Sequence, residues 1–479
     1  MAQPKRISQD TFDAVVKENL EEFEMELDEA VADAKQQFKS QGVDISNLIT
    51  SYVMDEDAEG SVVLKHSHPV KGASIYEDAL ESIQKSLSGN NLDQLTESLG
   101  VFHLQCNGNN ENKTFATHHG AAKVLLSAVK QLRNDPEHLI PALEALSSLV
   151  NGQGDILDKE ALETLFNILK DFDNDDKVLE QSLRNVRFSC IKRESNRQTF
   201  VSLNIIPLLM DNLQRHKSNR TLTKEICILL RVLTFDDDMS VPFGKAHEHA
   251  KMIVAEKAFP VILDAMEAVQ DNLDTLSELC ATLGKLFVRN EFCQEFVELG
   301  GLKVVLKLLE LNIEHQGIAK NVCAVLKALA GNDDVKKAVV ECKGMELVLI
   351  AMKTHEKHPF VAEQGCAALA SISLRDPENC AAIVAVGGPE VILKAMQLHC
   401  DIVTVQKPAC LALRNLVARN PDNCESILSA GGETLIRQAY QKFASECGDL
   451  AKAALRDLGC DVKLREPWTG QGRQLAPDT

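Results

Sequence analysis

The sequence contains few aromatic residues. They make up 4% of its 479 residues, with one Trp and three Tyr. The 45% hydrophobic content therefore comes mainly from aliphatic side chains and alanine, which suit the packing of helix against helix. This composition excludes disorder throughout the chain and predicts an all-α protein.

Long apolar runs and C-x-x-C pairs are also missing. No stretch approaches 18 uncharged apolar residues, and no basic N-terminal segment precedes an apolar run, so we expect neither a membrane span nor a secretory signal. The 14 cysteines then indicate a reducing compartment rather than a disulfide framework. We expect the protein in the cytosol, with the nucleus as a second location.

The sequence has fewer Lys and Arg residues than Asp and Glu residues. The formal net charge is −19, and the first 60 residues hold 15 Asp or Glu against 5 Lys or Arg. This balance argues against nucleic acid as a partner. Residues 1–54 are predicted to form an acidic helical arm. Residues 55–75 have lost the helical pattern and read as a flexible linker, and residues 464–479 read as an irregular tail.

The acidic arm has apolar residues at helical spacing, namely Leu20, Phe23, Leu27 and Val31. Such a face predicts that the arm could bind the rest of the chain. Autoinhibition, or capping of the first repeats, is the hypothesis that follows.

A structural repeat is visible in two independent markers. The first marker is a row of cysteines separated by 53, 43, 43 and 44 residues: Cys227, Cys280, Cys323, Cys366 and Cys410. The second is a set of loop glycines separated by 43, 44 and 44 residues: Gly301, Gly344, Gly388 and Gly432. Matching apolar positions extend this register backwards to Ala121, Ala161, Ile205 and Ala258. A period near 43 indicates a repeat architecture.

Each repeat contains three helical patterns, with glycine as the stop signal between the first and the second. This is typical of a right-handed α-solenoid of about eight armadillo-type repeats, which we place at residues 76–463. The periodic cysteines are then small buried core residues. Cys293, Cys380 and Cys424, eight residues before three of the glycines, are interpreted in the same way.

Several longer segments are similar to one family. They are residues 5–25, 233–254, 289–302, 329–336 and 451–471. On these segments the chain resembles the armadillo repeat-containing protein 6 family. The resemblance implies an intracellular, non-enzymatic armadillo protein.

The third helices line the concave groove in armadillo proteins, and importin alpha and the catenins place a ladder of asparagines there. Here only Asn185 and Asn415 match that ladder, and the groove tryptophans of importin alpha have no counterpart. A receptor for nuclear localisation signals is therefore not expected. Basic residues instead recur at or just before the ladder position: Arg184, Arg231, Lys285, Lys327, Arg414 and Arg456. They predict a groove for acidic or extended segments, although they could also be solvated residues beside the core.

The spacing of 53 residues places an insertion of about ten residues at 236–249, on the edge of the solenoid. Its candidate functional residues are Asp236, Asp237, Asp238, Phe243, His247 and His249. Three interpretations stay open. Asp236 could cap neighbouring amides, the insertion could be a partner-binding lip, or the carboxylates and histidines could form the site of a metal-dependent hydrolase.

Signatures of catalysis are absent from the sequence. There is no G-x-x-x-x-G-K-[ST], no G-x-S-x-G and no H-E-x-x-H. We therefore predict a monomeric, non-enzymatic scaffold or adaptor with no cofactor and no resident metal. It would bind protein partners rather than nucleic acid or membrane, along the groove and at the edge loop. A client-holding or assembly factor is the alternative, and the hydrolase is a remote one.

Overall fold

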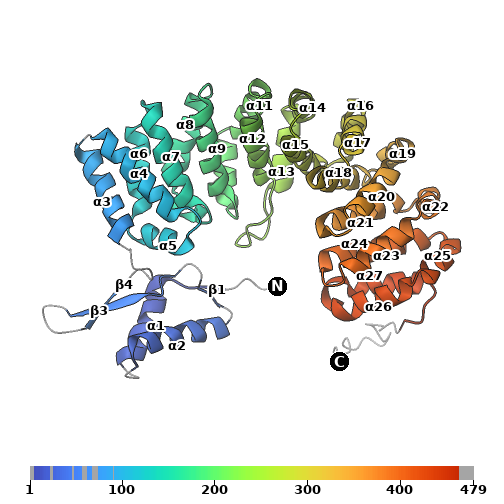
Figure 1. Cartoon of the computed structure of the whole chain (residues 1–479), viewed down its shortest axis with the longest axis horizontal. Coiled ribbons are helices and arrows are strands. Elements are labelled where there is room, and N and C mark those ends of the chain that lie inside the picture. The colour runs from blue at the N-terminus through green and yellow to red at the C-terminus, as the bar shows by residue number, and fades with distance from the viewer. Residues whose placement is uncertain are drawn as a thin grey trace, which may run out of the picture. The chain divides into compact units, whose positions relative to one another are not determined.

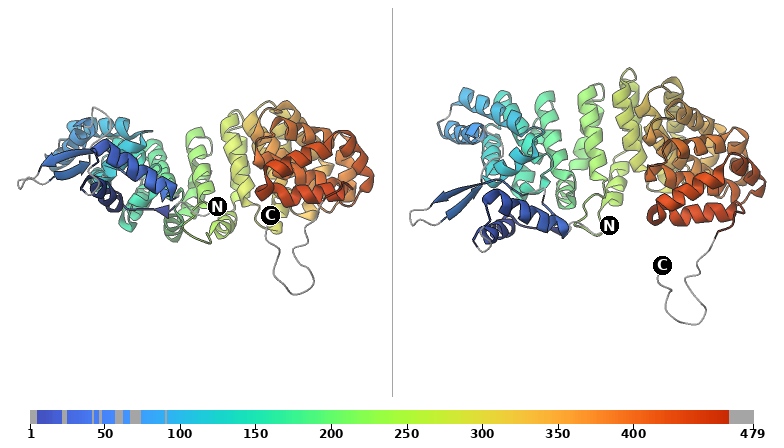
Figure 2. Two further views of the ribbon diagram at one scale, coloured as in Figure 1. Left: turned by 90° about the horizontal axis from the view of Figure 1, so that it is seen from below. Right: turned by 60° about the horizontal axis from the view of Figure 1, so that its bottom comes forward.

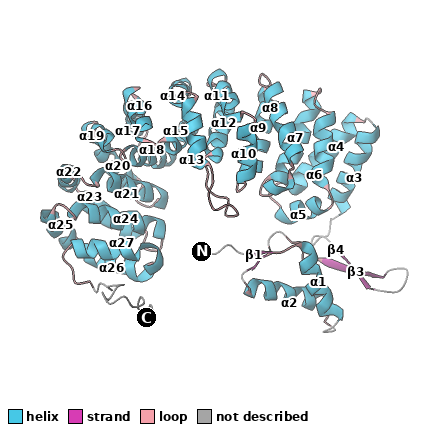
Figure 3. Cartoon of the chain, turned by 180° about the vertical axis from the view of Figure 1, so that it is seen from behind, coloured by secondary structure: helices cyan, strands magenta, loops and turns pink. Residues whose placement is uncertain are grey.

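The computed structural model describes residues 5–21, 25–41, 43–45, 48–56, 62–66, 74–89 and 91–462 (Figure 1). Helices dominate this part of the chain, and the strands assigned in it all lie in the first 66 residues (Figure 3). The chain divides into two compact units. The first comprises Met1–Asn212 and Ile228–His249, and the second comprises Leu213–Cys227 and Ala250–Thr479.

The N-terminal residues form a small folded module with its own core. Helices α1 (Gln9–Glu21) and α2 (Leu27–Ser40) pack against each other, and Phe12 and Phe38 meet with ring centroids 5.8 Å apart. Strand β1 (Lys5–Arg6) pairs in parallel with β2 (Val43–Asp44), and β3 (Tyr52–Glu56) pairs antiparallel with β4 (Val62–His66). The Tyr52 hydroxyl donates to Asp13 Oδ1 at 2.6 Å, which ties the end of the module to α1.

This module changes the interpretation of the acidic arm. Leu20, Leu27 and Val31 pack into the cluster around Phe12, so the predicted apolar face is satisfied within the arm itself. Phe23 lies outside the described residues. Strand β4 falls in the segment expected to be a linker and pairs with β3 as a hairpin. The sequence between the two strands contains Gly60, which is compatible with a hairpin as well as with the predicted linker. The boundaries at 54 and 75 stay predictions, and residues 464–479 lie outside the described part.

The solenoid helices follow in chain order, and each repeat has a first, a second and a third helix. The pair α3 (Ser74–Gly89) and α4 (Leu92–Cys106) precedes the complete repeats. The next three repeats are α5 (Asn110–His118), α6 (Ala121–Gln131) and α7 (Pro136–Val150); η1 (Gly154–Ile156), α8 (Lys159–Asp171) and α9 (Asp176–Cys190); and α10 (Glu194–Ser202), α11 (Ile205–Arg215) and α12 (Arg220–Leu233).

The later repeats have the same order. They are α13 (Ala246–Ala255), α14 (Ala258–Ala268) and α15 (Leu273–Leu286); α16 (Asn290–Glu298), α17 (Gly301–Leu311) and α18 (Gln316–Leu329); and α19 (Asp333–Glu341), α20 (Gly344–Thr354) and α21 (Pro359–Ser373). The last two are α22 (Pro377–Ala385), α23 (Gly388–Leu398) and α24 (Val403–Val417), and η2 (Pro421–Asn423) with α25 (Cys424–Ser429), α26 (Gly432–Lys442) and α27 (Ala444–Asp457).

The glycine register predicted the starts of the second helices. Seven of the eight marked residues are the first residue of a second helix, and α8 begins two residues before Ala161. Where two glycines stand together, the first turns the chain: Gly300, Gly387 and Gly431 have φ of +78°, +82° and +84°. An L side chain rarely adopts this conformation, whereas glycine does so without strain. The predicted armadillo-type solenoid is confirmed, and the N-terminal strands are an addition to it.

The third helices carry the core from one repeat to the next. In the second unit α15, α18, α21, α24 and α27 pack in sequence, each against the following one. Figure 2 shows these helices, coloured from yellow-green to red, from two further directions. All five periodic cysteines are fully buried, which confirms their interpretation as core residues.

Candidate functional site

The fourth residue of a first helix reaches toward the end of a third helix. Lys113 Nζ donates to the carbonyl oxygen of Asn151, and Lys336 Nζ donates to that of Leu374, both at 2.8 Å. The Cys380 thiol donates to the Asn415 carbonyl at 3.3 Å in the same way. Carbonyls at a helix C-terminus lack helical partners and carry partial negative charge, so donors are favoured here. This position explains Cys293 and Cys380, which are buried as predicted. Cys424 is the first residue of α25 and is only partly buried, so its interpretation as a buried core residue was wrong.

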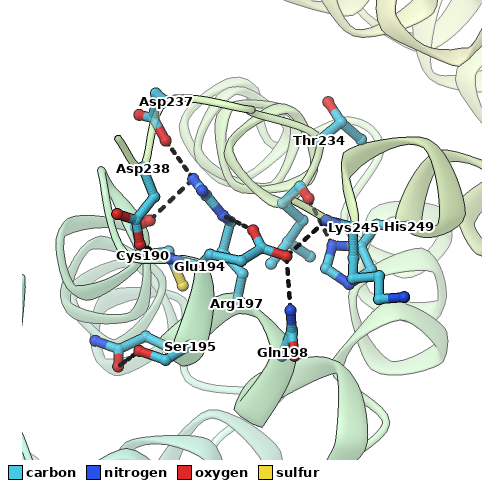
Figure 4. Close-up of polar contacts among 12 residues, drawn as sticks. Cys190, Glu194, Ser195, Arg197, Gln198, Thr234, Asp237, Asp238, Lys245 and His249 are labelled. Atoms are coloured by element: carbon cyan, nitrogen blue, oxygen red, sulfur yellow. Dashed lines mark hydrogen bonds and ion pairs between the residues drawn. The ribbon is translucent and has the colours of Figure 1, made fainter. Parts of the chain in front are cut away.

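In α10 the fourth residue is an arginine, and it holds the insertion. The Arg197 side chain is fully buried. Its Nε donates to Glu194 Oε2 at 2.9 Å, and its Nη1 donates to Asp237 Oδ1 at 2.6 Å and to the Cys190 carbonyl at 3.3 Å (Figure 4). In this repeat Asp237 of the insertion therefore accepts the hydrogen bond that a carbonyl at the end of a third helix accepts in other repeats.

Two further contacts fix the insertion to the start of α10. Asp238 Oδ2 accepts a hydrogen bond from the backbone N–H of Glu194 at 2.8 Å. On the far side of the loop, the backbone N–H of Lys245 donates to Glu194 Oε1 at 2.7 Å. The loop is therefore held near both ends. Carboxylates of the insertion do cap backbone amides, but the residues are Asp238 and Asp237. Asp237 Oδ2 accepts a hydrogen bond from the Lys192 N–H at 3.2 Å. Asp236, the residue predicted for this role, is exposed.

The two histidines of the insertion have different positions. His249 is the fourth residue of α13, and its Nδ1 lies 2.8 Å from the carbonyl of Leu233 at the end of α12. This contact to the third helix of the preceding repeat resembles that of Arg197 with the Cys190 carbonyl. His247 is exposed. Because Asp237 and Asp238 are engaged by Arg197 and by backbone amides, these side chains do not converge on one point. Nowhere in the described residues do three His, Cys, Asp or Glu form a group that could hold a metal ion.

The charges of this network stabilise one another. Burial alone would raise the pKa of Glu194, but hydrogen bonds from Gln198 and from the Lys245 amide, together with Arg197, lower it below its ordinary value of 4.5. Burial likewise opposes ionisation of Asp238, yet hydrogen bonds from Ser240 and from the Glu194 amide lower its pKa below 3.8. Burial works against the charge of Arg197, but Asp237 and Glu194 raise its pKa overall. All three groups are therefore charged at neutral pH.

Acid should loosen this loop. A carboxylate whose pKa is lower in the folded state contributes stability above its unfolded pKa and loses it as the pH falls through the folded pKa. Below about pH 4 we expect the amides of Glu194 and Lys245 to lose protection, measured by hydrogen exchange corrected for intrinsic rates. Asp238→Asn keeps an acceptor that does not titrate, so its Glu194 amide should show a smaller loss. Equal losses in both proteins would contradict this account.

The two ladder asparagines belong to the packing. Asn185 is fully buried, and its Nδ2 donates to the carbonyls of Leu143 and Gln181, both at 2.9 Å. Asn415 Nδ2 donates to the carbonyl of Ala370 on α21, also at 2.9 Å. These amides join one third helix to its neighbour. Asn185 is therefore not part of the candidate groove surface, because a buried side chain cannot contact a partner.

The predicted basic residues are not equivalent. Arg184 pairs with Glu180 at 2.6 Å. Arg414 and Arg456 both pair with Asp457, at 3.2 and 2.6 Å. Glu180 and Asp457 thus offset much of the positive charge of these three arginines. The arginines therefore do not form a continuous basic stripe. Arg231, on α12, is partly exposed.

Two further basic residues, Lys285 and Lys327, lie in the second unit. Lys285 on α15 is exposed, and Lys327 on α18 is half-buried, with its Nζ 2.9 Å from Gln364 Oε1 on α21. Burial lowers the pKa of Lys327, and the nearby charge of Lys285 lowers it further, against the opposing effect of Glu363. Two cations therefore lie within electrostatic reach on successive third helices. The repeat register places both residues at or just before the same position of successive third helices, so their proximity follows from the repeat.

Among the described residues, no helix is by itself long and apolar enough to cross a membrane. Only α22 and α23 together pass that test, and they are bent by 74° at their junction.

One family model matches the N-terminal module and another matches the repeats. The ARMC6 family model matches residues 76–477, and the model of the armadillo repeat-containing protein 6 N-terminal domain matches residues 4–63. Armadillo repeat-containing protein 6 from Homo sapiens is 43% identical over 483 aligned residues, covering 99% of this chain and 94% of the human protein. The Drosophila melanogaster homolog is 32% identical over 317 residues, covering 65% of this chain and 64% of that protein.

Solved structures support the fold. A crystal structure of an engineered protein matches with a TM-score of 0.63 at 20% identity, covering 80% of this chain and 88% of that one. A structure from work on the interaction between cadherin and beta-catenin matches with a TM-score of 0.55 at 17% identity, covering 82% and 74%. Armadillo-repeat proteins commonly mediate protein interactions and are typically non-catalytic. With family models matched along most of its length and a human relative aligned almost end to end, the chain belongs to the armadillo repeat-containing protein 6 family.

Proposed function

We propose that this protein is a non-enzymatic scaffold of the cytosol that holds an acidic segment of a partner protein against the third helices of the second unit. The observation that carries the proposal is the pair Lys285 and Lys327 on α15 and α18. The repeat fold supports it, because stacked third helices present an extended surface on which a peptide can lie.

The physical basis is the mutual repulsion of the two lysines. The nearby charge of Lys285 is one cause of the lowered pKa of Lys327. A carboxylate placed near both ammonium groups would relieve this repulsion. Partial burial of Lys327 reduces the screening of such a contact by water, so the attraction is stronger than at a fully exposed lysine.

Charge reversal tests the proposal. We expect Lys285→Glu with Lys327→Glu to remove most proteins found near the wild-type chain by proximity labelling in cells. In vitro, a fluorescein-labelled peptide rich in Glu should bind the purified wild type with a salt-dependent affinity, measured by anisotropy. The double variant should bind it at least about tenfold more weakly, since two attractive contacts become repulsive.

The matched control is Lys303→Glu with Lys307→Glu, which makes the same charge change at exposed positions of the second helix α17. It should leave both the labelled proteins and the peptide affinity unchanged. Equal loss in the two double variants would show an effect of net charge alone and reject the groove. If a broad set of proteins is labelled and stays the same in both double variants, the client-holding alternative would be favoured.

A further inference from the structure

The insertion ends in an exposed apolar tip. Phe243 is 86% exposed and Met239 is 69% exposed, and Phe243 is the most exposed large hydrophobic side chain in the described residues. Single exposed hydrophobics are ordinary on protein surfaces. Here, however, a phenylalanine and a methionine stand four residues apart on one short loop with Pro242, also exposed, between them.

The same loop is held at its base by an ion pair and two hydrogen bonds. A buried arginine, Arg197, grips Asp237, while Asp238 caps α10 and the Lys245 amide closes the loop onto Glu194. In the repeats of α5 and α19 the same helix position donates to a backbone carbonyl, whereas here the buried guanidinium of Arg197 pairs with a carboxylate of the loop. These contacts fix where the tip stands before any partner arrives.

Rigidity of this kind favours binding through the tip. Association costs the conformational freedom of every side chain and loop that becomes ordered, and a preformed loop has lost part of that freedom already. Aromatic side chains that fill a pocket are the residues that contribute most at interfaces. Phe243 is aromatic and stands on a loop that is held at its base, so it has both of these properties.

The charge around the tip indicates what would receive it. Asp237 and Asp238 are engaged at the base of the loop. The remaining Asp, Glu and Lys side chains between residues 236 and 249 are Asp236, Glu248 and Lys245, an excess of one carboxylate. Asp236, next to the network but not capping it, is exposed. An apolar pocket with a basic rim would complement this surface, whereas an acidic rim would be repelled.

We propose that the edge loop, residues 236–249, is a preformed anchor that inserts Phe243, with Met239 beside it, into an apolar pocket with a basic rim on a folded partner protein. This surface lies in the first unit, and the lysine pair of the proposed groove lies in the second. Failure of either proposal therefore leaves the other intact.

Site-specific photo-crosslinking in the full-length protein tests the anchor. The photoreactive residue p-benzoylphenylalanine replaces Phe243 in one protein and Leu104 of α4 in the control, because Leu104 is similarly exposed, at 74%, on a helix surface. The cross-linked residues of partners are then mapped by mass spectrometry. We expect position 243 to cross-link to a folded protein at residues that line an apolar pocket flanked by Lys or Arg, and position 104 not to do so.

Affinity for the partner so identified gives the second measurement. Phe243→Ser should weaken binding at least about tenfold. Asp236→Lys should weaken it by an amount that shrinks as salt is added. Leu104→Ser should leave affinity unchanged, and all three variants should melt as the wild type does, because each changed side chain is exposed. Cross-links shared by both positions, cross-links to a second copy of the chain, or unchanged affinity of Phe243→Ser would overturn the proposal.

Discussion

Arg197→Met is expected to lower the free energy of unfolding by about 3–5 kcal/mol, because it leaves the carboxylate of Glu194 buried without its cation. The Glu194 side chain is only 1% exposed, so water cannot replace the guanidinium. Methionine fills a similar volume, which limits the contribution of a cavity. The change should be measured by urea denaturation at neutral pH, with hydrogen exchange to show that the loss begins at α10 and the insertion.

A nearby arginine provides the control for Arg197. Arg193 pairs with Asp155 at 2.7 Å, but both side chains have access to water, with exposures of 29% and 50%. Exposed ion pairs contribute about 1 kcal/mol or less, so Arg193→Met should have a small effect. Similar losses for the two variants would mean that burial does not distinguish these ion pairs. A double variant, Arg197→Met with Glu194→Gln, should recover part of the stability because the isolated charge is removed.

The repeat register could be predicted because its markers have a physical cause in every repeat. A glycine recurs where the chain turns with positive φ or where a second helix begins against the preceding first helix. A small cysteine recurs where third helices pack. Both requirements are local to one repeat, so the sequence repeats them. The N-terminal strands have no such repetition. Strand β1 pairs with β2 far along the chain, and β3 and β4 form a single hairpin, so no repeat marks either pairing.

The edge loop shows what a sequence cannot resolve at the level of single residues. Three consecutive aspartates have the same chemistry, and only the fold decides that Asp237 faces Arg197 while Asp236 faces outward. The insertion itself was visible from the repeat length. Its partner, Arg197, was not, because the fourth position of a first helix holds lysine, arginine, histidine or cysteine in different repeats. These residues share a hydrogen-bond donor and a place in the fold rather than a sequence pattern.

The close approach of first and second helices makes the second glycine of each pair sensitive to substitution. A Cβ on Gly388 would lie 2.3 Å from Ile383 Cγ2 and 2.8 Å from the Ile383 carbonyl oxygen. The oxygen belongs to the backbone of α22, so it cannot move aside as a side chain could. We expect Gly388→Ala to lower the free energy of unfolding by about 1–3 kcal/mol, the usual cost of overpacking, and to lower the melting temperature.

Two comparisons separate this contact from other effects of glycine. A Cβ added at Gly100, within helix α4, would meet no atom of a neighbouring segment within 4 Å, so Gly100→Ala should raise stability by up to about 1 kcal/mol through helix propensity alone. Gly387→Asn should cost less than Gly388→Ala, because Asn204 and Lys343 already adopt φ of 64° and 60° before a second helix. If Gly388→Ala were neutral, first and second helices would have room to separate. The glycine pairs would then mark only the turn, and the close approach of the two helices would not be what requires the second glycine of each pair.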